Sequence, residues 1–246
     1  MEYLSNNVRK IFRFISDERK KLISEYVIDC MTKGYRNVEQ NEFTNNKINY
    51  EDMEFLREYS GYNFKFINNA FRGIWNYEDN GNIEARNRFI NDGRRVADII
   101  KSNPSYVSID FRVYRGVSIE YFREYDIEKI EDLVKLRGQF ILDKGFVSTS
   151  ISENDSFFKK KNELGINYNV MITYLIPKEF DDGIFLYGDM TYSSNQKEYL
   201  INSYNMAKVV SVNINDDETA NIVAIIIPKK IYDEYYSNVN NQNRIR

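Results

Sequence analysis

The apolar residues of this chain change their spacing once, at residues 103–105, where the sequence reads NPS. Before this point apolar residues recur at three- and four-residue steps, the period of a helix with one buried face. After it they follow a period of two or form short runs bounded by turn residues, as in strands. A chain that places its helices first and its strands afterwards favours an α+β domain with a mostly antiparallel sheet.

Helices are expected in the first part of the chain and strands in the rest. We predict helices within residues 8–30, 51–75 and 82–103, the second of them broken near Gly61. Seven strands are expected, at residues 108–117, 139–150, 167–177, 183–188, 197–203, 207–215 and 219–229, with short helices at 119–136 and 153–164. Since no repeat or linker divides the sequence, residues 1–246 are expected to form a single domain, with a helical extension (1–45), a core (46–230) and a C-terminal tail (231–246).

What the sequence lacks excludes several classes of function. It contains no histidine, which excludes Ser-His-Asp catalysis, Cys-His catalysis and histidine-ligated zinc. Its one cysteine, Cys30, excludes an internal disulfide and fits an apolar helical pattern as a small core residue. The net charge is −3, so we expect no stable nucleic-acid binding. We also expect no membrane binding, because the sequence has no apolar run of about 18 residues and no stretch typical of a signal peptide.

Three polar side chains are predicted on strand faces that are otherwise apolar. Arg115 ends an apolar alternation in its strand. Ser148 shares a face with Phe146, and Glu198 shares one with Leu200. Each has a structural explanation of its own: a buried ion pair for Arg115, strand-end hydroxyls for Ser148 and a sheet-edge charge for Glu198. Buried polar groups are costly, however, unless they satisfy one another or a ligand.

Together the arginine, the hydroxyl and the carboxylate describe a site. An arginine fork suits a phosphate or a diphosphate. A carboxylate held by a serine hydroxyl can stabilise positive charge that develops on a sugar ring. Because no nucleophile with a neighbouring base is apparent in the sequence, these residues favour cleavage of a glycosidic bond through an oxocarbenium-like state.

The same residues carry a family resemblance. Arg115 in YRG, STS at 148–150 and QKE at 196–198 occur in the order and approximate spacing of the R-S-E class of ADP-ribosyltransferases. These are the cholera-like enzymes, which include clostridial binary toxins and Rho-modifying exoenzymes. YSGYNFKFINNAFRG (59–73) resembles the helix that helps to hold NAD in bacterial exotoxins, and GQFILDKGFVSTS (138–150) is similar to the second block of the family. The resemblance runs from about residue 50 to residue 228. It implies N-terminal helices packed on a two-sheet, mostly antiparallel β core with an NAD cleft.

The resemblance implies a role in NAD binding for four residues. Arg115 would grip the phosphates and, with Gly116, position the nicotinamide ribose. Asn68 and Arg72 would complete the cleft from the helix. NAD is then a substrate, and no metal is expected, because the charge to be met belongs to a departing cation.

The catalytic roles fall on the two strands that follow. Ser148 would orient Glu198, and Glu198 would bond the ribose 2′-hydroxyl as nicotinamide leaves. Residues 153–164 occupy the position of the loop that closes over the cofactor, where Phe157 or Phe158 would pack against the nicotinamide; of the two we assign Phe158 to the cofactor site.

Gln196 bears on the choice of acceptor. In this family a Glu two residues before the catalytic Glu goes with arginine acceptors. A Gln there goes with asparagine in Rho-type GTPases or with guanine in DNA, and an amide can donate one hydrogen bond and accept another. Rho-modifying members usually place an aromatic residue five positions before the catalytic Glu. Here that position is Ser193, and Tyr192 precedes it. We therefore assign substrate recognition to Gln196 and Tyr192.

The resemblance thus implies a mono-ADP-ribosyltransferase that transfers ADP-ribose from NAD to a host protein, with an asparagine of a Rho-type small GTPase as the first candidate acceptor. Transfer to arginine or to guanine, or hydrolysis of NAD, remain alternatives, as does a non-catalytic binding module with the same fold. We further expect a secreted or injected bacterial effector that acts in the target-cell cytosol, delivered with a separate translocation component, through a secretion apparatus or by direct injection.

Overall fold

The change of period at residues 103–105 marks the boundary between helices and strands in the computed structural model, which describes residues 15–44, 48–77, 81–156, 158, 165, 167–191 and 197–232. The helices before it are α2 (Asp17–Thr32), the 3-10 turn η1 (Gln40–Glu42), α3 (Tyr50–Glu58), η2 (Tyr59–Asn63), α4 (Phe64–Arg72) and α6 (Ile83–Ser102). The strands are β1 (Phe111–Val117), β2 (Phe140–Asp143), β3 (Val147–Ser150), β4 (Val170–Ile176), β5 (Gly183–Leu186), β6 (Glu198–Ile201), β7 (Asn205–Ile214) and β8 (Ala220–Ile227).

The helices begin and end at residues whose chemistry favours these positions. The side chains of Ser16, Asn49 and Asn82 each accept a backbone hydrogen bond from the residue three positions on, which satisfies an N–H group that the helix itself leaves unpaired. Gly73 ends α4 with a φ of 75°, a left-handed conformation that glycine adopts without steric cost. Sequence signals therefore set the start of α2, α3 and α6 and the end of α4, the helix that carries Asn68 and Arg72.

Two short α-helices meet near Gly61, as expected, but the chain between them stays helical. The helix continues from α3 to α4 through η2, a π-helical segment at Tyr59–Asn63. A π turn keeps the chain helical while it changes which side chains face the core, and such turns occur frequently at functional sites. Here the turn places Tyr59 in the interior, with 1% of its surface exposed.

The sheet is mostly antiparallel, as expected, and its strands form one continuous order rather than two separate sheets. Within the described residues the order is β2-β7-β8-β4-β1-β3-β6-β5, and of these neighbours only β4 and β8 are parallel. Strands β1 and β3 meet at one described residue pair, Tyr114 with Ser150. The sheet therefore divides at this junction into a part that ends in β1 and a three-stranded part, β3-β6-β5.

The single strand expected at 139–150 is instead two strands, one in each part of the sheet. β2 pairs with β7, and β3 pairs with β6. Between them the N–H of Gly145 donates to Oδ1 of Asp143, a local turn that an aspartate side chain favours. This turn carries the chain from one part of the sheet to the other, and so eight strands replace the expected seven among the described residues.

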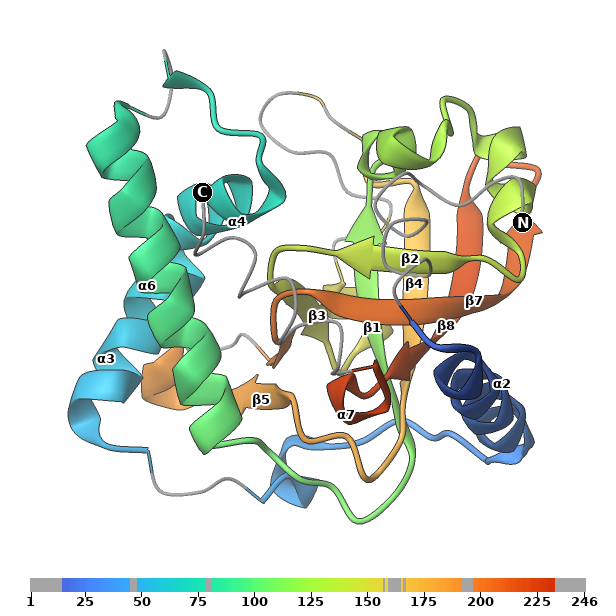
Figure 1. Cartoon of the computed structure of the whole chain (residues 1–246), viewed down its shortest axis with the longest axis horizontal. Helices are drawn as coiled ribbons and strands as arrows, with labels where there is room; N and C mark the ends of the chain where they lie inside the picture. The colour runs from blue at the N-terminus through green and yellow to red at the C-terminus, as the bar shows by residue number, and fades with distance from the viewer. Residues whose placement is uncertain are drawn as a thin grey trace.

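The smaller of two apolar cores lies between the helices and the three-stranded part of the sheet. Leu56 from α3, Ile67 from α4 and Ile100 from α6 belong to it together with Phe146 and Leu200. Figure 1 shows these helices gathered on the β5 side of the molecule, with α2 on the opposite side. Leu200 marks the strand face on which Glu198 is predicted, so this face of β6 looks toward α3 and α4.

The larger core covers the other face of the same strands and the rest of the sheet. Phe185 and Tyr199 belong to it, and their rings lie 4.3 and 5.8 Å from that of Phe43 in the N-terminal segment. Helix α2 contributes Ile23 and Cys30. Cys30 is fully buried, which confirms that it is a small core residue. The division into extension, core and tail stays a prediction.

The short helices expected among the strands are 3-10 turns. η3 (Ile119–Tyr125) and η4 (Ile130–Leu136) occupy the range 119–136. η5 (Glu153–Asp155) begins the range 153–164, most of which lies outside the described residues. A further 3-10 turn, η6 (Gly188–Met190), and a short α-helix, α7 (Lys229–Tyr232), complete the described elements. No described helix combines the length and the apolar character needed to cross a membrane.

Gly93 allows α6 to lie close to α4, and this gives a test of the packing. A Cβ at Gly93 would lie 2.2 Å from Cε2 of Phe71 and 3.0 Å from Cγ2 of Ile67. Gly93→Ala should therefore lower the free energy of unfolding by about 1–3 kcal/mol, because overpacking outweighs the better helix propensity of alanine. Urea titration measures this change. Gly34→Ala is the control, since nothing lies within 4 Å of its added Cβ. Equal stability of the two variants would contradict the close packing.

Candidate functional site

Glu198 is buried on the strand face that looks toward the helices. It begins β6, which has β3 on one side and β5 on the other. Only 4% of its surface is exposed. The explanation of Glu198 as a sheet-edge charge is therefore wrong, because β6 is an inner strand. A carboxylate in this position is costly, and its surroundings decide whether it ionises.

Burial raises the pKa of Glu198 from 4.5 to about 7. A hydrogen bond from the Ser148 side chain and the positive charge of Arg115 oppose this rise without cancelling it. Ser148 is exposed, although Phe146 beside it is fully buried. The predicted partners of Glu198 are thus close enough to act on it, and the carboxylate is poised between its two protonation states near neutral pH.

A second carboxylate, Asp143, joins the two predicted arginines. Nε and Nη2 of Arg72 each lie 2.9 Å from one of its oxygens, the bidentate geometry of an arginine fork. Nη1 of Arg115 lies 3.3 Å from Oδ2, and the hydroxyl of Tyr121 donates to the same oxygen at 3.0 Å. We call Asp143, Arg72, Arg115 and Tyr121 the arginine–carboxylate cluster. Burial alone would raise the pKa of Asp143, but the two guanidinium groups hold it below its ordinary value.

Small and polar residues of the neighbouring segments shape the cluster. Asn68 accepts a hydrogen bond from the N–H of Phe146 at 2.7 Å, which joins α4 to the connection between β2 and β3. A Cβ at Gly145 would lie 2.6 Å from Oδ1 of Asn68 and 3.1 Å from Cζ of Arg72. Only glycine lets the helix approach this closely. Asn68 therefore fixes the helix that carries Arg72.

Arg115 extends from β1 over the ring of Tyr121. Its Cζ lies 5.1 Å from the ring centroid, a cation–π distance. The N–H of the adjacent Gly116 donates to the carbonyl of Ser156 at 2.6 Å. The backbone of Gly116 thus holds the turn that follows η5 against β1, at the start of the predicted loop over the cofactor.

Sequence reasoning missed three residues of the site. Asp143 and Tyr121 belong to the arginine–carboxylate cluster. Tyr59 accepts a hydrogen bond from Nδ2 of Asn68 at 3.4 Å, and its pKa is raised, first by burial and then by the charge of Glu198. A signal for Asp143 was present, since an acidic residue ends the apolar run FILD five positions before Ser148. Nothing in the sequence singled out the two tyrosines among its 20.

The remaining predicted residues lie in or beside the undescribed segments. Gln196, Tyr192 and Phe157 are outside the described residues. Phe158 is described and half-buried, but its neighbours on both sides are not described. The structure thus brings Arg72, Asn68, Arg115, Ser148 and Glu198 into one region of the fold and leaves the assignments of the other residues as predictions.

The region contains two kinds of charged side chain, the arginines and Glu198, which suit ligand groups of opposite charge. The side chains of Arg72 and Arg115 are 25% and 16% exposed, whereas that of Asp143 is 4% exposed. Both arginine side chains therefore keep some exposed surface, whereas the carboxylate that they share is buried. Glu198 offers a carboxylate to a group that becomes positive. Among the described residues, no group of three or more His, Cys, Asp or Glu side chains is arranged to hold a metal ion.

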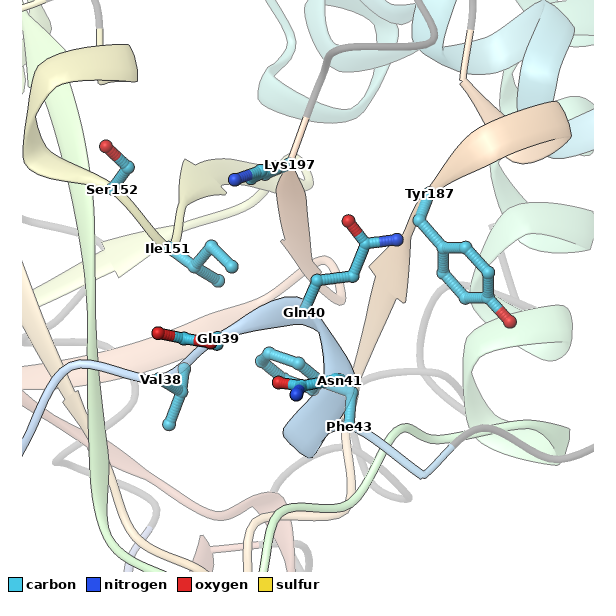
Figure 2. A pocket seen from close by; sticks show the side chains of 9 residues that line it. All are labelled: Val38, Glu39, Gln40, Asn41, Phe43, Ile151, Ser152, Tyr187 and Lys197. Atoms are coloured by element: carbon cyan, nitrogen blue, oxygen red, sulfur yellow. The ribbon is translucent and has the colours of Figure 1, made fainter.

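A groove of about 750 Å3 lies apart from this cluster (Figure 2). Phe43 and Asn41 of the N-terminal segment, Ile151 after β3, Tyr187 after β5 and Lys197 before β6 line it, together with Val38, Glu39, Gln40 and Ser152. Lys197 alternates with Glu198 along the strand, and Phe43 packs on the larger core. The groove therefore belongs to the opposite face of the three-stranded part from the Glu198 carboxylate.

The chain is similar to known proteins in sequence and in fold. Residues 33–231 match the family model described as ADP-ribosyltransferase exoenzyme. None of the curated proteins matches the chain significantly. Its fold resembles C3stau2 from S. aureus, whose structure was determined with NAD, at a TM-score of 0.56 and 16% identity, covering 74% of this chain and 89% of that chain.

Two further solved structures show the same likeness. The Clostridium limosum C3 exoenzyme has a TM-score of 0.53 and 12% identity, covering 74% of this chain and 87% of that chain. C3larvin, an ADP-ribosyltransferase toxin from Paenibacillus larvae, has a TM-score of 0.55 and 19% identity, covering 73% of this chain and 96% of that chain. At these identities the structural similarity establishes the fold.

The raised pKa of Glu198 predicts a cost in stability that depends on pH. The folded state binds this proton more tightly than the unfolded state, so stability falls as the pH rises from below 4.5 to above about 7. The full difference corresponds to roughly 3 kcal/mol. Glu198→Gln removes the ionisation, and should raise the melting temperature at pH 8 but much less at pH 5. Thermal melts at both pH values measure this difference. An equal change at the two values would contradict the burial argument.

Proposed function

The chain belongs to the ADP-ribosyltransferase exoenzyme family and is an NAD-dependent mono-ADP-ribosyltransferase, and from this premise we propose that Arg115, Ser148 and Glu198 carry its reaction. The observation that supports this proposal most directly is the environment of Glu198. It is a buried carboxylate with a raised pKa, and it lies within the influence of a serine hydroxyl and an arginine. A purely structural carboxylate would be held by compensating partners, as Asp143 is.

In the proposed reaction Glu198 acts on the nicotinamide ribose. The bond between ribose C1′ and the nicotinamide nitrogen breaks, and its electron pair leaves with nicotinamide. The ribose becomes cationic, and the carboxylate, which accepts a hydrogen bond from the 2′-hydroxyl, offsets the charge. Ser148 orients the carboxylate through its hydrogen bond. The acceptor then forms the new bond to C1′ and loses a proton.

Arg115 and Arg72 are proposed to bind the phosphates of NAD. Both arginine side chains are partly exposed, and arginine forks match phosphate geometry. Asn68 and Gly116 contribute by fixing α4 and the turn after η5 rather than by free polar groups, since Oδ1 of Asn68 and the N–H of Gly116 already have partners. Phe158 is proposed to pack against the nicotinamide.

The acceptor is proposed to be an asparagine of a host protein of the Rho-type small GTPase class. Gln196 supports this choice, because its amide can pair with a side-chain amide by one donated and one accepted hydrogen bond. Tyr192 would contact the partner surface. The net charge of −3 argues against DNA. Because the proposed acceptor is a host protein, we further propose that the chain acts as a secreted or injected effector in the target-cell cytosol.

Glu198→Gln should leave the fold and NAD binding largely intact while it lowers the rate of nicotinamide release. The amide has nearly the same shape but cannot offset positive charge, and a loss of such electrostatic stabilisation costs roughly a hundred- to thousandfold in rate. Nicotinamide release from NAD measures the rate, and thermal melts control for folding. In the native chain the rate should rise with pH through about 7, where Glu198 ionises. Near-native turnover of the variant would overturn the assigned role of Glu198.

Gln196→Ala should separate acceptor choice from NAD cleavage. We expect most transfer to protein to be lost while hydrolysis of NAD, with water as acceptor, is retained. Labelling of a eukaryotic cell lysate with tagged NAD, followed by identification of the modified protein and residue, measures the transfer. Tyr192→Ala should behave in the same way, because Tyr192 is proposed to contact the partner surface; thermal melts of both variants control for folding. If Gln196→Ala lost both activities in equal proportion, Gln196 would belong to the NAD site instead.

A further inference from the structure

We propose that Asp143 is a positioning residue for NAD: it holds Arg72 and Arg115 from behind, so that the unused N–H groups of both guanidinium groups face the diphosphate. This inference rests on the proposed function of the site. It adds a residue that makes no contact with NAD itself and acts only through the two arginines.

The hydrogen bonds to Asp143 use only some of the N–H donors of Arg72 and Arg115, and they fix the direction of the remaining ones. Arg72 uses Nε and Nη2 on Asp143, and Arg115 uses Nη1. This leaves Nη1 of Arg72 and Nε and Nη2 of Arg115, for which no protein acceptor occurs among the described residues. A guanidinium group is planar, so fixing one edge also fixes the direction of the others. Asp143 therefore determines where the remaining donors point.

The order of burial places the carboxylate behind the arginines. The exposed fraction of the side chain falls from 25% for Arg72 to 16% for Arg115 and 4% for Asp143. An anion that enters from solvent meets the guanidinium groups before it meets the carboxylate. NAD can therefore bind the outer edges while the bonds to Asp143 persist, and no exchange of partners is needed.

The position of Asp143 is itself fixed independently of the arginines. Its Oδ1 accepts the N–H of Gly145 at 2.9 Å, and its Oδ2 accepts the hydroxyl of Tyr121 at 3.0 Å. The ring of Tyr121 also lies under the guanidinium group of Arg115. A backbone group and a packed ring thus anchor the carboxylate, which is what a rigid support for two long side chains requires.

The charges of the arginine–carboxylate cluster make the inference testable, because attraction alone and positioning predict opposite changes in anion binding when Asp143 is removed. Two guanidinium groups and one carboxylate leave one net positive charge for a diphosphate. Removal of the carboxylate would double that charge and, by attraction alone, would tighten anion binding. If Asp143 acts by positioning, its removal should weaken binding instead, because the two arginines lose their fixed geometry.

The experiment uses the full chain and ADP-ribose, which contains the diphosphate of NAD but no nicotinamide. Asp143→Asn should weaken ADP-ribose binding in calorimetric titration by roughly tenfold, the value of one charge-assisted hydrogen bond. The KM for NAD should rise by a similar factor. The kcat for nicotinamide release should change by less than about threefold, because Glu198 and Ser148 are untouched. A change confined to KM is not what general loss of structure produces.

Asp182→Asn is the matched control. Asp182 is equally buried and pairs with Lys229 at 2.6 Å and with Asn202 at 2.7 Å, at the end of the β5–β6 pair away from Glu198. It should lose stability with no change in ADP-ribose affinity. Should Asp143→Asn fail to fold, Tyr121→Phe keeps every charge and the ring but removes one bond to Asp143. It should weaken ADP-ribose binding in the same direction, by less than the tenfold expected for Asp143→Asn.

The outcomes separate this inference from the proposed function. A native chain that neither binds ADP-ribose nor releases nicotinamide would overturn the proposed function and the inference with it. A native chain that does both, with Asp143→Asn or Tyr121→Phe binding ADP-ribose as tightly or more tightly, would overturn the inference alone. In that case Asp143 would only lower the positive charge of the site.

Discussion

The ion pairs of Asp143 with Arg72 and Arg115 connect three parts of the fold that are far apart in the sequence. Arg72 belongs to α4, Arg115 to β1, and Asp143 to the end of β2, so the partners lie 71 and 28 residues apart in sequence. Breaking a buried pair by removal of one partner leaves an uncompensated charge, which is strongly destabilising. One carboxylate thus links α4, β1 and the end of β2.

The two carboxylates of the site experience opposite environments. Two guanidinium groups, a hydroxyl and a backbone N–H compensate Asp143, and its pKa lies below the ordinary value. Glu198 has one hydroxyl and the charge of Arg115, and burial raises its pKa to about 7. Carboxylates whose surroundings move their pKa values apart usually perform different tasks. The compensated one supports structure, and in the proposed reaction the uncompensated one meets a charge that develops on the ribose.

The sequence predicted the features that depend on the local spacing of apolar residues and missed those that depend on tertiary packing. Alternation alone placed Glu198 on the face of Leu200, and the structure has that arrangement. The division of 139–150 into β2 and β3 was missed, since an apolar run cannot reveal that its halves pair with different strands. Asp143 was missed for the same reason: it ends a strand as many polar residues do, and only the approach of α4 gives it partners.

The β5–β6 pair explains how NAD chemistry and acceptor choice can be separate within one short stretch of chain. Leu186 pairs with Glu198, and Ile184 with Leu200, so both ends of the connection 187–197 are fixed by the sheet. The strand pairing of β6 and its burial against the helices then determine the position of Glu198. Residues within the connection need not support it. Gln196 and Tyr192, which are proposed to select the acceptor, belong to that connection in sequence. Binding residues in a connection between rigid strands can vary without altering the scaffold. A change of acceptor through these residues would therefore leave Arg115, Ser148 and Glu198 in place.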